Sequence, residues 1–142
     1  MLRQLLRISH PMCMPNQTVT RTLESDIEPD KLYSVVAKAG NITRWAPVFA
    51  DAIEKISGTR HEVTKNGEVF VVEVLLHPSA RAVDYIREMT EGRRGGAYIR
   101  VMPRPLGGST IAMTVPLGLA SESSVAKVLE QELADLVQIA SA

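Results

Sequence analysis

The chain has 142 residues, with 16 basic and 16 acidic side chains, so its formal net charge is zero. The absence of a basic excess argues against a nucleic-acid binder, and without a run of about 18 apolar residues we predict no membrane span and no stable membrane insertion. The single cysteine, Cys13, excludes an internal disulfide and a cysteine-based zinc site, and favours a reducing, cytoplasmic location.

The first 16 residues differ in composition from the rest of the chain. The segment MLRQLLRISHPMCMPN is slightly basic and contains no acidic residue. It has neither the long apolar stretch nor the small-residue cleavage site of a secretory signal. We therefore predict a disordered tail over residues 1–16 and a single domain over residues 17–142, a length that can bury one hydrophobic core.

The N-terminal part of the domain predicts a strand followed by two short helices. In QTVTRTLESDI, alternate residues are apolar or β-branched, the period-two pattern of a half-buried strand. Pro29 suits the first turn of a helix, apolar residues then recur at helical spacing, and Gly40 is a natural stop. The residues NITRW add a second short helical turn, which ends before the next proline.

The middle of the chain predicts an antiparallel meander. Six strand-like segments are separated by turn residues, and Asn66-Gly67 between two of them is a strong two-residue hairpin signal. Strands joined by such short turns pair antiparallel, because a parallel partner needs a long crossover. The six segments are DAIEKISG, RHEVTK, EVFVVEVLLH, RAVDYIREM, AYIRVMP and STIAMTV.

The C-terminal segment SESSVAKVLEQELADLVQIA predicts one long amphipathic helix. Serines at its start are candidate caps, and its apolar residues fall on one face at 100° per residue. Such a helix needs an apolar partner surface, and the sheet is the only large one predicted. The apolar face comprises Val125, Val128, Leu129, Leu133, Leu136, Val137 and Ala140.

This order of elements resembles the START-related (SRPBCC) superfamily, which includes polyketide cyclases, lipid-transfer proteins and Bet v 1-like allergens. The similarity is carried by DIEPDKLYSVVAKAGNITRWAPVFADAIEKI, LLHPSARAVDYIREM, GGAYIRVMP and LGGSTIAMTV. The resemblance implies an α+β helix-grip fold, in which a seven-stranded curved antiparallel sheet surrounds the C-terminal helix and two short helices lie between strands 1 and 2. It also implies that Trp45 lines or plugs the rim of the space between helix and sheet.

A curved sheet cannot contact a straight helix along its whole length. Aromatic residues make up only 4% of the chain, which favours an internal apolar cavity over a solid core. The alternative is that the six methionines fill the gap, since methionine packs irregular spaces well.

Strand parity predicts which side chains face this space, because charged residues such as Glu73, Asp84 and Glu88 mark the outer face. Helix periodicity adds residues from the C-terminal segment, and Tyr33 and Tyr85 are candidate hydroxyl donors. The predicted ligand-binding residues are Tyr33, Trp45, Phe70, Val72, Val74, Tyr85, Arg87, Met89, Met113, Leu129, Glu132 and Leu136.

Three charged residues conflict with this apolar interior. Arg21 and Arg87 have inward parity, and Glu132 lies within the apolar stripe of the C-terminal helix. Buried charges pair or bind something, so one interpretation is a polar floor that orients a ligand carboxylate, enolate or phenolate. The other is a structural ion pair, or arginine stems whose charged ends reach the rim.

The leading functional hypothesis is a module that binds one small hydrophobic or amphipathic molecule, such as a lipid, a polyketide-like aromatic or an isoprenoid. A second hypothesis is a cyclase, aromatase or dehydratase, in which Arg87 and a tyrosine hydroxyl, Tyr85 for example, stabilise an enolate. A third is a stress or regulatory domain that binds a partner. The sequence leaves the oligomeric state open.

We predict neither a cofactor nor a metal site. His10, His61 and His77 do not have metal-ligand spacing, and no nucleophile elbow or phosphate-binding loop is present in the sequence.

Overall fold

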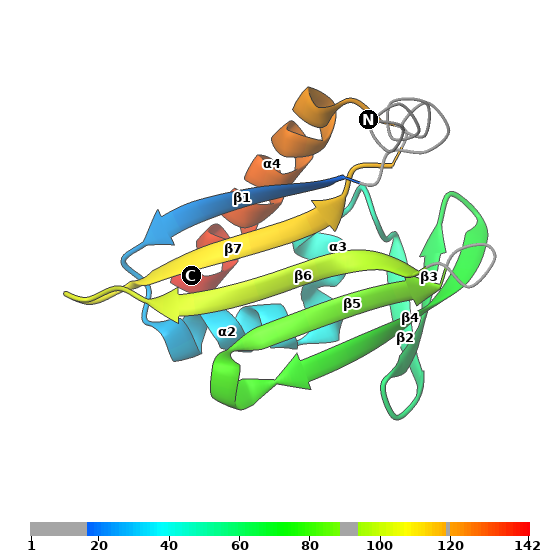
Figure 1. Cartoon of the computed structure of the whole chain (residues 1–142). Coiled ribbons are helices and arrows are strands. Elements are labelled where there is room, and N and C mark those ends of the chain that lie inside the picture. The colour runs from blue at the N-terminus through cyan, green and yellow to red at the C-terminus, as the bar shows by residue number, and fades with distance from the viewer. Residues whose placement is uncertain (1–16, 89–93, 119) are drawn as a thin grey trace, which may run out of the picture.

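The computed structural model describes residues 17–88, 94–118 and 120–142, so the tail predicted over residues 1–16 lies outside the described residues. Seven strands form one antiparallel sheet with the order β1-β7-β6-β5-β4-β3-β2, and the predicted meander is confirmed (Figure 1). The first strand pairs with the last and so completes one edge. The strands are β1 (Thr18–Ser25), β2 (Ala52–Ser57), β3 (Arg60–Lys65), β4 (Glu68–His77), β5 (Ala82–Glu88), β6 (Arg94–Pro103) and β7 (Ser109–Pro116).

The helices all lie on one face of this sheet (Figure 1). Between β1 and β2 the chain forms α2 (Pro29–Ala37), the 3-10 turn η2 (Ala39–Asn41) and α3 (Ile42–Trp45), and a second 3-10 turn, η3 (Pro78–Ala80), connects β4 to β5. The long helix α4 (Glu122–Ser141) ends the chain and packs against β1, β7, α2 and α3.

The hairpin predicted at Asn66-Gly67 is confirmed. Both residues adopt positive φ angles, 52° and 80°, between β3 and β4, which is the conformation that a two-residue turn requires. The Asp51 carboxylate also accepts a hydrogen bond of 2.9 Å from the backbone N–H of Asn66. This contact ties the turn to the start of β2.

Helix α4 begins at the serines that were predicted to cap it. The Ser121 hydroxyl accepts a 3.2 Å hydrogen bond from the Ser124 backbone N–H, so Ser121 is the N-cap. The buried stripe is rotated slightly from the predicted one, since Val125, Val128 and Val137 are only half-buried. The buried residues of α4 are Ala126, Leu129, Glu132, Leu133, Leu136 and Ala140.

Strand parity predicted the core correctly over most of the sheet. Ile99 and Val101 are buried while Tyr98 and Arg100 on the same strand are exposed. Leu76, which shares the parity of Val72 and Val74, is nevertheless 46% exposed. The difference arises because alternation decides only the face of the sheet, whereas burial also needs a layer packed over that face.

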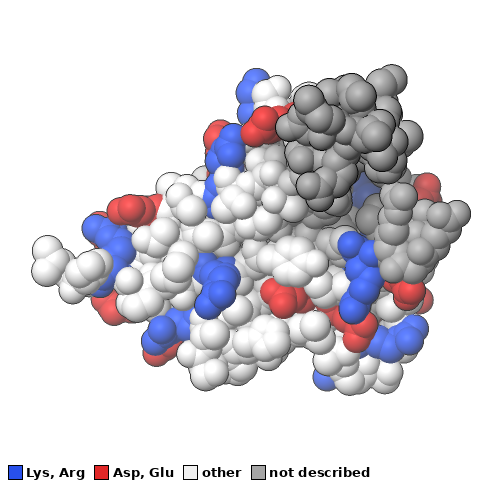
Figure 2. Space-filling model, in the orientation of Figure 1, with Lys and Arg blue, Asp and Glu red and all other residues white. Residues whose placement is uncertain are grey.

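The face of the sheet that the helices leave uncovered carries charges of both signs. Figure 2 shows basic and acidic side chains interspersed among uncharged residues on this side. The core therefore lies entirely between the other face and the helices.

Substitution of Gly96 should destabilise the fold. Gly96 pairs with Ile86 across the β5–β6 ladder, and a Cβ atom there would collide with the carbonyl oxygen of Tyr85. We expect Gly96→Ala to lower the free energy of unfolding by about 1–3 kcal/mol, measured by urea denaturation. Gly40→Ala is the control, because a methyl group at Gly40 would meet open space within the described structure. Equal stability of the two variants would contradict the close approach at Gly96.

Candidate functional site

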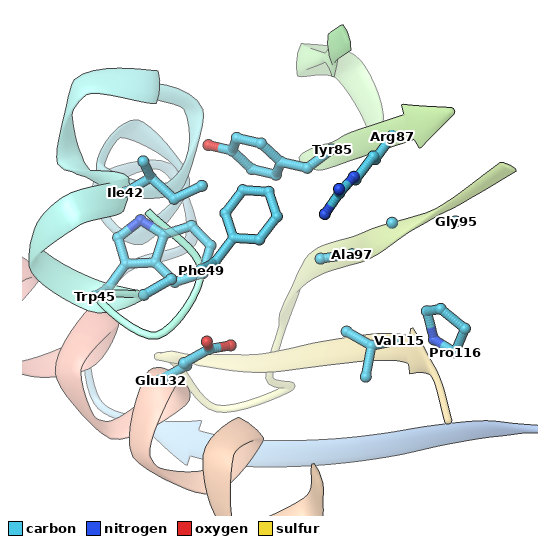
Figure 3. Close-up of a pocket in the computed structure, with 12 residues that line it drawn as sticks. Ile42, Trp45, Phe49, Tyr85, Arg87, Gly95, Ala97, Val115, Pro116 and Glu132 are labelled. Carbon is cyan, nitrogen blue, oxygen red and sulfur yellow. The ribbon is translucent and has the colours of Figure 1, made fainter. Parts of the chain in front are cut away.

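A pocket of about 250 Å³ lies where α3, α4 and the strands β5, β6 and β7 converge (Figure 3). Helix α3 and the turn after it supply Trp45 and Phe49, β5 supplies Tyr85, and β6 supplies small residues. The lining residues are Ile42, Trp45, Ala46, Phe49, Tyr85, Arg87, Gly95, Gly96, Ala97, Val115, Pro116 and Glu132.

Aromatic rings in edge-to-face contact build one side of this pocket. Trp45 is 2% exposed, and its ring centroid lies 5.9 Å from that of Tyr85 at an interplanar angle of 68°. Phe49, in the turn after α3, packs in the same way against Phe70 of β4, with 5.5 Å between centroids. Such pairs contribute about 0.5–1.5 kcal/mol beyond their area burial. The rings therefore stabilise one another, and Trp45, Phe49 and Tyr85 form one wall of the pocket.

Tyr85 presents its ring to the pocket but not its hydroxyl. The hydroxyl donates a 3.0 Å hydrogen bond to the backbone carbonyl of Val36, in α2. Burial, followed by the nearby Tyr33, raises the pKa of the Tyr85 hydroxyl well above its ordinary value. The hydroxyl is therefore a neutral donor that fastens the sheet to α2, and it points away from the pocket (Figure 3).

Arg87, two residues along β5 from Tyr85, brings a cation to the pocket. Its guanidinium carbon lies 3.8 Å from the centroid of the Phe70 ring, a cation–π contact. Within the described residues the guanidinium forms no ion pair and no hydrogen bond. Its register partner on β6 is Gly95, whose lack of a side chain leaves space beside it.

Glu132 brings a carboxyl group to the same pocket from α4. The residue is 9% exposed, and its side chain has no hydrogen-bond or ion-pair partner among the described residues. Burial, and secondarily the negative charge of Asp135, raises the pKa of the Glu132 carboxyl from 4.5 to about 7. Near neutral pH this group therefore exists in both protonation states.

The structure brings together four of the predicted site residues: Trp45, Tyr85, Arg87 and Glu132. Phe70 does not line the pocket, but its ring contacts the Arg87 guanidinium. Met89 lies outside the described residues. The others are core residues that do not line this pocket, and their role in binding stays a prediction; they are Val72, Val74, Met113, Leu129 and Leu136.

Two further expectations concern Arg21 and Tyr33. Arg21 pairs with Glu130 at 3.6 Å, not with Glu132, and its side chain is 36% exposed. Arg21 thus belongs to a surface ion pair and not to a polar floor, because its long stem carries the charge past the core.

The Tyr33 hydroxyl is buried and has no hydrogen-bond partner within the described part of the chain, and Tyr33 does not line the pocket.

Sequence reasoning missed several lining residues. Phe49 lies in a turn, where no periodicity reports on burial, and Pro116 ends a strand. The run Gly95-Gly96-Ala97 did contain a signal, because three small residues in one strand opposite Tyr85 and Arg87 leave space that larger side chains would fill.

Comparison with solved structures identifies the fold. A START superfamily protein from Mycobacterium smegmatis aligns with a TM-score of 0.66 and 12% identity, over 87% of this chain and 97% of that one. The Zhui aromatase/cyclase from Streptomyces sp. R1128 aligns at 0.64 and 15% identity, over 90% and 94% of the two chains. The protein has the START-related helix-grip fold. Ara h 8.0201 shares this helix-grip fold at a TM-score of 0.58 and 16% identity, over 87% of this chain and 97% of that one.

No protein-family model and no curated protein matches the sequence. Within residues 17–88, 94–118 and 120–142, no helix is both long and apolar enough to cross a membrane.

Glu132 should make the stability of the protein depend on pH. Its pKa is higher in the folded state, about 7, than the ordinary 4.5 expected when unfolded. The stability that this proton contributes is therefore fully present below pH 4.5 and lost as the pH rises through 7. Relative to Glu132→Gln, we expect the free energy of unfolding of the wild type to fall by about 2–3 kcal/mol between pH 5 and pH 8.

Urea denaturation of both proteins across this pH range measures the effect, and comparison with the Gln variant removes contributions from other titrating groups. Parallel stability curves for the two proteins would contradict the raised pKa of Glu132.

Proposed function

We propose that this protein binds one small, mainly apolar molecule in the pocket between α3, α4 and the sheet. The observation that carries the proposal is a pocket of about 250 Å³ walled by Trp45, Phe49 and Tyr85, into which Arg87 and Glu132 project (Figure 3). A concave apolar site with a few convergent polar groups is the usual form of a small-molecule site.

The size of the pocket favours a compact ring system over a long lipid chain. An apolar cavity of about 150 Å³ holds benzene, and drug-sized ligands occupy roughly 300–1,000 Å³. A pocket of about 250 Å³ thus suits a fused-ring aromatic or a short isoprenoid. The aromatic wall supports the same choice, because flat rings stack well against it.

Binding is better supported than cyclase or aromatase chemistry. The enzyme hypothesis gains from the similarity to the Zhui aromatase/cyclase and from the presence of Arg87 in the pocket. As predicted from the sequence, it also pairs Arg87 with a tyrosine hydroxyl as a second donor to the enolate. The Tyr85 hydroxyl is engaged with the Val36 carbonyl and is turned away from the pocket, so this residue does not supply that donor.

Reducing the pocket volume should weaken binding without harming the fold. Ala97 lines the pocket from β6, and Ala97→Leu fills part of the space. We expect isothermal titration calorimetry with 2-naphthol to show binding to the wild type, and an affinity at least about tenfold lower, or about 1.4 kcal/mol, for this variant.

Ala112→Leu is the matched control, because Ala112 lies on β7 opposite Arg100, on the uncovered face of the sheet. The control should bind like the wild type, and urea denaturation should show that both variants remain folded. If Ala97→Leu binds 2-naphthol as tightly as the wild type does, the pocket is not the site.

A further inference from the structure

The two polar groups of the pocket come from different walls and are not partners of each other. Arg87 projects from β5 and Glu132 from α4, and both point into the same space (Figure 3). Among the described residues no ion pair joins them. The walls between them are apolar, formed by Phe49, Ala97 and Val115. A ligand that fills the pocket therefore meets one cationic and one carboxylic group at separate points.

The Arg87 end suits an acidic oxygen group. The guanidinium carbon lies over the Phe70 ring, 3.8 Å from its centroid, and none of its N–H groups donates to an acceptor among the described residues. A planar fork of donors matches a carboxylate and binds it in bidentate fashion. Since Phe70 is itself packed edge-on against Phe49, the guanidinium is held in place before a ligand arrives.

The Glu132 end suits a hydrogen-bond donor and disfavours an anion. Asp135, in the same helix, adds negative charge to its surroundings. Trp45 of α3 faces Glu132, and its indole nitrogen lies on the side of Ile42 (Figure 3). Among the strand residues that line the pocket, Arg87 is the charged one. A ligand anion placed against Glu132 would be repelled when the carboxyl is ionised, whereas a hydroxyl can pair with either of its protonation states.

We infer that the occupant of the pocket is a compact ring hydroxy acid, with its acidic oxygen group on Arg87 and its hydroxyl on Glu132. This inference rests on the proposed binding function and extends it by naming the chemistry at each end of the ligand. The two ends also fix the orientation of the ligand, because reversing it would place the acid against Glu132 and the hydroxyl against Arg87.

Three naphthalene probes separate the contributions of the two ends. Isothermal titration calorimetry with the full chain at pH 7 would compare 6-hydroxy-2-naphthoic acid with 2-naphthoic acid, which lacks the hydroxyl, and 2-naphthol, which lacks the acid. We expect the hydroxy acid to bind at least about tenfold more tightly than either probe, as hydrogen bonds to charged groups generally allow.

Variants assign each preference to its residue. Arg87→Met should weaken both acids at least about tenfold and leave 2-naphthol within about twofold. Glu132→Leu should bring the affinities of the hydroxy acid and 2-naphthoic acid together. The controls are Arg100→Met, on the exposed face of β6, and Glu130→Leu, at an exposed position of α4 that pairs with Arg21; both should keep the wild-type order of affinities.

The outcomes distinguish this inference from the function on which it rests. If 2-naphthol binds the wild type as tightly as the hydroxy acid, the ring-binding function stands and the two-ended recognition is wrong. If Arg87→Met weakens all three probes equally, Arg87 only supports the pocket wall, which also overturns the inference. If none of the three probes binds, the proposed function falls with it.

Discussion

The packing of the straight helix α4 against one face of a twisted antiparallel sheet is the constraint from which the pocket follows. Helix α4 contacts β1 and β7 at one side of the sheet, together with α2 and α3. The inner face of β5 and β6 is therefore covered by the shorter helices and the turn that follows them. Where these two coverings meet, the layers diverge and the pocket remains between them (Figure 1; Figure 3).

The residues around this gap are arranged to keep it open. Tyr85 cannot collapse into the space, because its hydroxyl is fastened to the Val36 carbonyl on α2 and its ring is held edge-on against Trp45. Opposite them, Gly95, Gly96 and Ala97 have too little volume to fill it. The hydrogen bond of Tyr85 thus has two consequences: it joins the sheet to the helix layer and it fixes one wall of the pocket.

The charges in the pocket are difficult to explain by stability alone. Glu132 is buried in an apolar stripe where a leucine would pack better, and a buried carboxyl with no protein partner costs free energy. Arg87 is in part compensated by the Phe70 ring, but its donors find no acceptor among the described residues. Groups kept at such a cost are common where a ligand completes their interactions, and a ligand in the pocket would complete those of Arg87 and Glu132.

The order and type of the elements could be predicted from the sequence, because they depend on local signals. Period-two alternation, the Asn66-Gly67 turn and the serine cap at Ser121 each act within a few residues, and each appears in the structure as expected. The pairing order of the sheet followed from the short connections. Parity and helical spacing also indicated that Tyr85, Arg87 and Glu132 face inward.

Only the tertiary structure decided which inward residues border the pocket and which fill the core. Val72, Met113 and Leu129 share the pattern of the lining residues, yet close packing buries them, while Phe49 reaches the pocket from a turn that has no pattern. The partner of Arg21 proved to be Glu130 and not Glu132. Which carboxylate an arginine pairs with depends on where its flexible side chain places the guanidinium. Periodicity records the direction of a side chain from its own strand or helix, whereas a cavity depends on the distances between elements far apart in the sequence, and those distances are set by packing of the whole domain.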